Sequence, residues 1–368
     1  MSLFGKNEVN TSRQFEFDMA KAVCILGMVL VHCFEMLTSG SETDTSVAYY
    51  IMVSVLDCVF GAGTFMLCMG LGIAYSWKGN ADLQIKRGVS IFLLGYLLNF
   101  ARDGIPSILL TLLGEETWSS AIVITLCTDI MPFAGLALLL FGLLKKLKLS
   151  DGAFFAIALG MSVLGSFLRF FDFGNPILNS IAGLFIGTVD PDMEDGMACF
   201  PLLNWFIIVV IGYLYGNLLR RCTDKKKYYA VAFPVSALLL AVYFALSIPG
   251  RFGMMSGDLR FYYHFSTPNA VILFLGAVFA TGLYYFLSFL LSEKVKKVIT
   301  RISSHINTIY CIHWLIICWL DYVLEWFDFT NFSDGALFLV GILIFTVSVL
   351  LAEMRARSKE KKRNVATQ

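Results

Sequence analysis

The chain has 368 residues, of which 58% are hydrophobic and 15% are charged, and its formal net charge is +1. In soluble domains about a quarter of the residues are charged, so this composition excludes a soluble globular protein and indicates a polytopic membrane protein. A net charge so close to zero gives no reason to expect a nucleic-acid partner. The nine cysteines lack ligand spacings such as CxxC, so we expect neither a metal site nor a disulfide framework.

Ten apolar segments are long enough to cross a hydrocarbon core of about 30 Å, which takes about 20 helical residues. In chain order they are residues 17–38, 48–76, 88–110, 119–144, 153–171, 198–219, 228–248, 268–291, 305–326 and 335–353. The expected fold class is an all-α membrane bundle of about ten transmembrane helices. An apolar piece within 172–197 leaves an eleventh, partial span as an alternative. His264 falls in a loop and is expected at the surface.

The basic residues predict how this bundle is oriented. Of the 28 Lys and Arg residues, 23 fall in the N-terminal arm, in alternate loops or in the C-terminal tail, all on one side of the predicted membrane. Loops rich in Lys and Arg stay in the cytoplasm, so both termini are expected there. We therefore predict a multi-pass protein of the cell membrane. It has one integral-membrane domain over 1–353 and a charged cytoplasmic tail over 354–368.

The first apolar segment contains four polar residues that lipid should not tolerate: Asp18, Lys21, His32 and Glu35. Ionisable groups inside a membrane are functional by default. At about 100° per residue, the eleven steps from Lys21 to His32 return to within about 20° of the same helix face, about 16 Å further along the axis. Asp18 and Glu35 extend this face by three residues at each end. The alternative is an ion-paired anchor with a hydrogen-bonded core histidine.

Further polar residues stand in later apolar segments: Arg102, Asp129, and the pair Tyr310 and His313, three residues apart. Helical spacing places Tyr310 and His313 on one face. Because lipid would reject all four side chains, we expect them to face an interior cavity. For Arg102 the alternative is an interfacial ion pair with Asp103.

Two motifs mark the first part of the chain. Lys21 is followed by ten residues and then by His32, and the stretch FMLCMG at 65–70 is followed by the basic pair Lys86-Arg87. The first motif matches the Arg/Lys-x10-His signature of the acyltransferase-3 family of integral-membrane acyltransferases. The second resembles the second span of that family, which also precedes a basic pair.

Two later motifs extend the resemblance to nearly the whole chain. FPLLNW at 200–205, leading to GYLYG at 212–216, is similar to a later span of the family. Residues 303–313, which end in YCIH, resemble its near-terminal helix with a Y-x-x-H ending. The stretch from Asp57 to Gly70 also resembles the heparan glucosaminide N-acetyltransferase type of the wider superfamily.

The resemblance implies an enzyme that moves an acyl group, usually acetyl, from cytoplasmic acyl-CoA to a hydroxyl or amine of a glycan or another acceptor, with O-transfer favoured over N-transfer. It implies no permanently bound cofactor, and acetyl-CoA or another acyl-CoA is a co-substrate. His32 would be the general base, because an imidazole titrates near neutrality. Direct transfer and a covalent acyl-histidine both fit one histidine. Glu35 would orient the ring, or it is an interfacial carboxylate.

Two groups of residues would bind the substrates. Cations suit the phosphates of acyl-CoA. The acyl-CoA group comprises Lys21, Lys86 and Arg87, together with Asp18. The acceptor group comprises Arg102, Asp129, Tyr310 and His313, of which His313 is alternatively a second imidazole.

The main alternative function is a proton-coupled secondary transporter or flippase, since interior charges and a histidine in a protein of many spans also describe such carriers. Against it, the sequence shows no pair of repeated halves with broken helices. A structural or receptor-like protein is a third alternative, which gives no function to the polar face of the first apolar segment. The expected partners are acyl-CoA, an acceptor molecule and the lipid bilayer, and the sequence predicts no oligomeric state.

Overall fold

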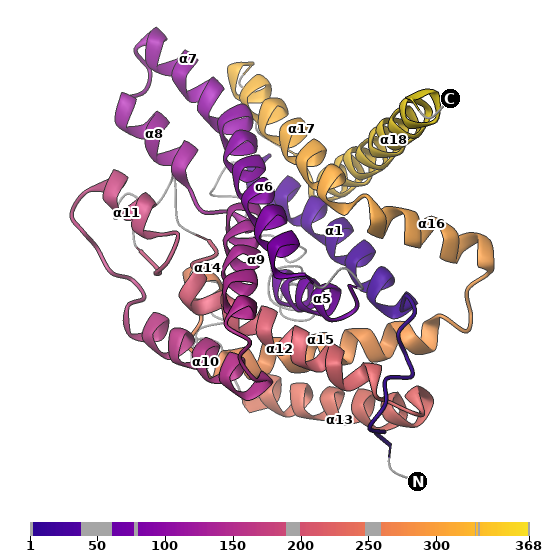
Figure 1. Ribbon diagram of the computed structural model, residues 1–368. Helices are drawn as coiled ribbons and strands as arrows, with labels where there is room; N and C mark the ends of the chain where they lie inside the picture. Colours follow the sequence, from indigo (N-terminus) through magenta and orange to yellow (C-terminus); the bar gives the residue numbers. More distant parts are fainter. Residues whose placement is uncertain are drawn as a thin grey trace. The chain divides into compact units, whose positions relative to one another are not determined.

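A computed structural model describes residues 3–37, 61–76, 80–188, 199–246, 259–327, 329 and 332–366 (Figure 1). Helices make up most of these ranges, and extended pairing within them is confined to two isolated bridges, Phe4 with Cys222 and Phe171 with Thr188. A helix satisfies its backbone hydrogen bonds internally, as a lipid environment requires. The predicted all-α class is confirmed for the described residues.

Six described helices are long and apolar enough to cross a membrane. They are α1 (Phe15–Met36), α12 (Leu202–Arg220), α13 (Lys225–Leu246), α15 (Asn269–Leu287), α17 (Ile306–Trp326) and α18 (Asp334–Ala366). The pair α8 (Trp118–Leu126) and α9 (Ile130–Lys146), bent by 50° at its break, is a broken span or a re-entrant loop and brings the number to seven if it counts as one span. These helices describe a multi-pass membrane protein, whereas ten or eleven spans and cytoplasmic termini stay predictions.

Shorter helices form the rest of the described helical residues. These are α5 (Ala62–Ala74), α6 (Ala81–Asn99), the π-helix η2 (Phe100–Gly104), α7 (Ile105–Leu113), α10 (Asp151–Phe167), α11 (Pro176–Ala182), α14 (Leu259–Tyr263) and α16 (Glu293–Ser304). Some lie in expected spans and others, such as α14 and α16, in predicted loops. The elements α6, η2 and α7 follow one another without a break along the expected span 88–110. The first part of the expected span 48–76, including Asp57, lies outside the described residues.

The chain forms two compact units. Unit 1 comprises residues 1–13 and 62–282, and unit 2 comprises residues 14–61 and 283–368. In unit 2, α18 runs from the last expected span into the expected tail and ends at Ala366. The proposed division between a membrane domain and a tail at residue 353 stays a prediction.

The FMLCMG and GYLYG motifs hold α5 against α12 in unit 1. A Cβ atom on Gly70 would collide with the carbonyl oxygen of Val209, and one on Gly212 would collide with that of Leu67. Small residues let two helix backbones approach this closely, which is one way in which helices associate in lipid. These two motifs therefore have a packing role that involves no substrate.

A similar close approach joins α6 and α9 in unit 1. A Cβ atom on Gly95 would lie 2.6 Å from the ring of Pro132, so only glycine fits there. The contact brings the end of α6 to the break between α8 and α9. There the side-chain amide of Asn99 donates to the carbonyl oxygen of Cys127 at 2.8 Å.

His264 lies inside unit 1, so the expected surface position is wrong. Its side chain has an exposed fraction of 0%, and its ring lies 5.6 Å from that of Phe170 between centroids. The segment that carries it packs against α12, where the indole N–H of Trp205 donates to the carbonyl oxygen of Tyr263 at 2.7 Å. Contacts between this loop and residues distant in sequence bury the side chain. The polarity of the local sequence does not predict such contacts.

The N-terminal arm covers the C-terminal end of α12 in unit 1. The backbone N–H of Gly5 donates to the carbonyl oxygen of Arg221 at 2.9 Å, and that of Val9 donates to Arg220 at 2.8 Å. The last carbonyl groups of a helix have no partner within the helix. The arm therefore supplies partners that water would otherwise supply.

In unit 2, α1 packs against α16, α17 and α18. The core of this unit includes Val29, Cys33 and Phe34 of α1, Ile317 of α17 and Ile344 of α18, all of them buried. Other helices thus cover much of the apolar surface of α1. The polar residues of α1 are therefore placed among protein groups as well as near lipid.

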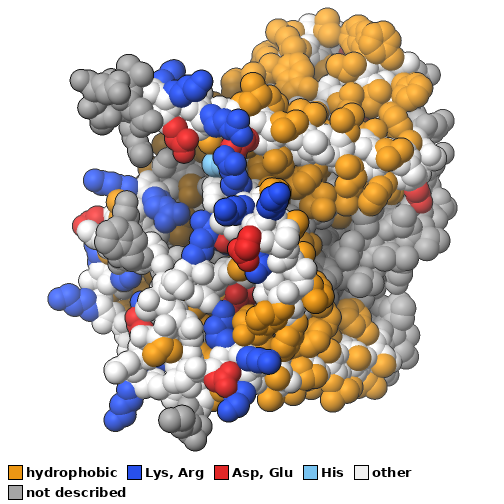
Figure 2. Space-filling model, turned by 90° about the vertical axis from the view of Figure 1, so that its right-hand side faces the viewer, with side chains coloured by type: hydrophobic (Ala, Val, Ile, Leu, Met, Phe, Trp, Pro, Cys, Tyr) orange, Lys and Arg blue, Asp and Glu red, His pale blue; other side chains and the backbone are white. Residues whose placement is uncertain are grey.

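Large hydrophobic side chains stay exposed on many described helices (Figure 2). Leu93, Leu112 and Leu238, for example, have exposed fractions of 62%, 68% and 64%. Figure 2 shows broad areas of hydrophobic side chains and other areas where Lys and Arg side chains gather. Monomeric soluble proteins rarely expose such surface, whereas lipid tails cover it without cost.

Candidate functional site

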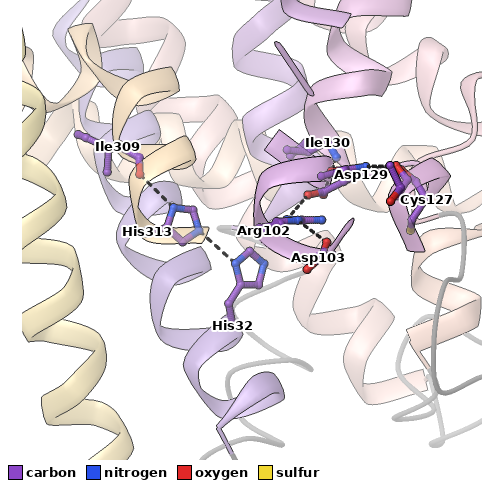
Figure 3. Close-up of polar contacts among 10 residues, drawn as sticks. His32, Arg102, Asp103, Cys127, Asp129, Ile130, Ile309 and His313 are labelled. Atoms are coloured by element: carbon purple, nitrogen blue, oxygen red, sulfur yellow. Dashed lines mark hydrogen bonds and ion pairs between the residues drawn. The ribbon is translucent and has the colours of Figure 1, made fainter. Parts of the chain in front are cut away.

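Two histidines meet between α1 and α17 of unit 2 (Figure 3). The Nδ1 atom of His32 lies 3.2 Å from the Nε2 atom of His313. The Nδ1 atom of His313 in turn lies 3.1 Å from the carbonyl oxygen of Ile309, one turn earlier on α17. The structure thus brings together two predicted site residues that are 281 positions apart in the sequence.

Two hydrogen bonds bear on where the protons lie when both rings of the pair are neutral. A carbonyl oxygen can only accept, so Nδ1 of His313 carries the hydrogen that it donates to Ile309. In a neutral ring Nε2 of His313 is then an acceptor, and Nδ1 of His32 must be the donor between the two rings. In this tautomer the basic nitrogen of His32 is Nε2.

Aromatic rings hold the pair in place. The indole of Trp314 stacks on the His32 ring, with centroids 4.0 Å apart and planes at 28°. The Tyr310 ring meets His313 edge to face at 5.3 Å. His313 is fully buried and His32 is half-buried. The arrangement fixes both rings while one of them keeps partial exposure.

Asp18 contacts its neighbours at the other end of the polar face of α1. Its carboxylate has an exposed fraction of 3% and accepts a hydrogen bond of 2.7 Å from the hydroxyl of Ser303 on α16. The ammonium group of Lys21 lies 4.0 Å from the same carboxylate oxygen, and the Lys21 side chain is 27% exposed. Asp18 therefore sets the position of a lysine that stays accessible.

A buried ion cluster lies in unit 1, where η2 meets the break between α8 and α9 (Figure 3). The Arg102 guanidinium donates to Asp103 at 2.8 Å and to Asp129 at 2.9 Å. The three residues have exposed fractions of 6%, 8% and 9%. Arg102 and Asp103 do form the pair considered as an alternative, and both side chains are enclosed by protein.

Local backbone features position this cluster. Asp129 is the N-cap of α9, and its other carboxylate oxygen accepts from the backbone N–H of Ile130 at 2.6 Å. Arg102 lies in the π-helical turn η2, and such turns occur frequently at functional sites. The cluster combines one cation with two carboxylates, so it offers hydrogen-bonding groups rather than net positive charge.

The roles of the remaining predicted residues stay predictions. Lys86 and Arg87 are exposed on α6 of unit 1. Near them Asp82 pairs with Lys146 at 2.6 Å, and the hydrogen bond from Lys146 lowers the pKa of Asp82. Glu35 is half-buried on α1, and its orienting role stays a prediction.

Several contributing residues were missing from the sequence-based set. Trp314 and the Ile309 carbonyl group sit on α17 beside His313, and Ser303 precedes them on α16. Ser303 opens the very motif that ends in His313, so this motif held a signal for it. No sequence signal pointed to the backbone oxygen of Ile309. Among the described residues, no group of three or more His, Cys, Asp or Glu side chains could hold a metal ion.

Comparisons with known proteins give one match. A family model described as an acyltransferase domain matches residues 14–353, which is nearly the whole chain. No curated protein and no solved structure matches significantly.

Proposed function

The chain belongs to the acyltransferase-3 family, and on this premise we propose that it transfers an acyl group, acetyl first of all, from acyl-CoA to a hydroxyl or amine of a glycan or another acceptor. The family membership indicates a membrane acyltransferase and agrees with the resemblance drawn from the sequence. The donor, the acyl group and the acceptor belong to the proposal. So does a position in the cell membrane with acyl-CoA on the cytoplasmic side.

The observation that carries the mechanism is the hydrogen-bonded pair of His32 and His313. The acceptor hydroxyl gives its proton to Nε2 of His32 while its oxygen attacks the thioester carbonyl carbon. The carbon–sulfur bond then breaks, and the proton passes from His32 to the departing thiolate, which leaves as free CoA. General base catalysis of this kind contributes about 10²- to 10⁴-fold in rate.

His313 supports the base in two ways. Its Nε2 accepts from Nδ1 of His32, which holds His32 in the tautomer that offers Nε2 to the substrate. When His32 becomes protonated, the positive charge can be shared across the hydrogen bond with His313. The Trp314 ring face also favours a cation stacked on it.

Substrate binding follows from the placement of charge. Lys21 is on α1, eleven residues or about 16 Å from His32 along the helix, so phosphates at Lys21 leave the pantetheine arm to run toward His32. Asp18 and Ser303 keep Lys21 at this end. Lys86 and Arg87 are proposed as further phosphate ligands. Arg102, Asp129 and Tyr310 are proposed to bind the acceptor.

Purified protein in nanodiscs tests the proposal with acetyl-CoA labelled in the acetyl group. We expect wild-type protein to release CoA and to acetylate glycans extracted from the host envelope. His32→Ala and His32→Gln should lose about 10²- to 10⁴-fold in rate while keeping a wild-type unfolding curve. His305→Gln is the matched control, because His305 lies in the same unit and pairs with Glu353 at 3.6 Å, away from the pair.

Unchanged acetyl transfer in folded His32→Ala protein would contradict the mechanism. Proton uptake into liposomes that depends on a substrate but not on acyl-CoA would favour a proton-coupled transporter or flippase instead. Comparing O-acetyl with N-acetyl groups in cells with and without the chain would then identify the acceptor.

A further inference from the structure

The helix α16 differs from the other described helices because it is short, highly charged and amphipathic. Over twelve residues its apolar side chains, Val295, Val298, Ile299 and Ile302, recur at three- and four-residue spacing and form one stripe. Val295 and Val298 are exposed by 43% and 56%. The helix is too short and too charged to cross a membrane, yet it holds apolar side chains away from the protein core.

Beside the two valines runs a row of cations. Lys294, Lys297 and Arg301 follow the same spacing and are all exposed. Arg301 also pairs with Glu353 of α18. The outer surface of α16 therefore combines an apolar stripe with positive charge at its edge.

The C-terminal end of α16 is fixed to other helices of unit 2. Ser303 donates to Asp18 of α1, and α17 begins directly after the end of α16 at His305. The Ser292 hydroxyl caps the first turn by accepting from Val295 at 3.4 Å. α16 is thus held in one orientation, which leaves its outer surface available to a partner.

We propose that α16 lies in the plane of the membrane surface and binds anionic phospholipids. Val295 and Val298 would enter the boundary of the acyl chains, and Lys294, Lys297 and Arg301 would contact the phosphates. A short basic amphipathic helix is typical of this mode of binding. A soluble phosphate compound would pair with the lysines but would leave the valines in water, so a lipid surface fits both features.

The predicted orientation agrees with this partner. The loop that contains α16 is expected on the cytoplasmic side, where membranes carry anionic lipids. The hydrogen bond from Ser303 to Asp18 connects α16 to Lys21, so lipid binding would steady the proposed acyl-CoA end of α1. This last consequence rests on the proposed function, whereas the lipid contact does not.

Hydrogen–deuterium exchange of the full chain in nanodiscs tests the contact. Backbone amides of α16 should exchange about tenfold more slowly in phosphatidylcholine with phosphatidylglycerol than in phosphatidylcholine alone. The double variant Lys294→Gln/Lys297→Gln should lose this difference. The matched control Lys361→Gln/Lys362→Gln, with two exposed lysines at the end of α18, should keep it.

A second variant separates insertion from charge. Val295→Ser/Val298→Ser changes two exposed side chains and should raise exchange of α16 in the anionic nanodiscs. Equal exchange of α16 in both lipid compositions would overturn the proposal, as would loss of the difference in the α18 control. Lipid-dependent exchange in protein that shows no acyl transfer would refute the proposed function and leave the lipid contact standing.

Discussion

The two buried polar clusters differ in the kind of group that forms them. In unit 2, His32 and His313 form a hydrogen-bonded pair of imidazole rings that contacts one carbonyl group and one indole, and His32 keeps partial exposure. In unit 1, Arg102 is enclosed between Asp103 and Asp129. Hydrogen-bonded imidazoles can pass a proton from one ring to the other, whereas a buried ion cluster is strongly destabilised when one partner is removed. We therefore expect the first cluster to govern rate and the second to govern stability as well.

The largest stability effect is expected at Arg102. Arg102→Met keeps the side-chain length but leaves the two carboxylates without their cation, so the free energy of unfolding should fall by about 3–5 kcal/mol. Denaturation of the detergent-solubilised protein measures it. Arg87→Met is the control, because Arg87 is exposed on α6, the helix that leads into η2. This change should shift the free energy of unfolding by less than about 0.5 kcal/mol.

A double variant sharpens this prediction. Arg102→Met combined with Asp103→Asn removes one of the two negative charges, and we expect it to recover about 1–2 kcal/mol relative to Arg102→Met alone. If both variants unfold like the wild type, the cluster has no structural role and the contrast between the two units is lost.

The next effect concerns rate and is expected at His313. His313→Leu removes the acceptor for Nδ1 of His32, and acetyl transfer should fall about 10- to 100-fold. His313→Gln retains a hydrogen-bonding group and should restore part of the rate. The pH dependence of kcat/KM should change in His313→Leu, which a purely structural role would not produce. An unaltered pH profile at an unaltered rate would show that His32 acts alone.

The smallest effect is expected at Trp314. Trp314→Leu keeps an apolar neighbour but removes the ring face under His32, so kcat should fall about fivefold. Trp314→Phe keeps a ring face and should lose less. Trp319→Leu is the matched control, because this tryptophan is 40% exposed on the same helix. Equal losses in Trp314→Leu and Trp319→Leu would exclude a specific stacking role.

The sequence predicted the helical class and the face shared by Lys21 and His32, because both follow from composition and from helical periodicity within one segment. It did not predict the contact between His32 and His313, since no periodicity relates residues on separate helices. The expected span 119–144 is broken after Leu126, where Asp129 caps a new helix. The segment does hold a signal for this break, because Asp129 is a typical N-cap residue and Pro132 follows it in the first turn of α9.

The arm that caps α12 has a practical consequence for handling the protein. Its backbone contacts, from Gly5 to Arg221 and from Val9 to Arg220, replace solvent at a helix end. An affinity tag or cleavage site that replaces these residues would remove hydrogen-bond partners from the end of α12. This loss would destabilise the helix that carries Trp205. A tag joined after Gln368 leaves the arm intact, so purification handles and fluorescent labels belong at the opposite terminus.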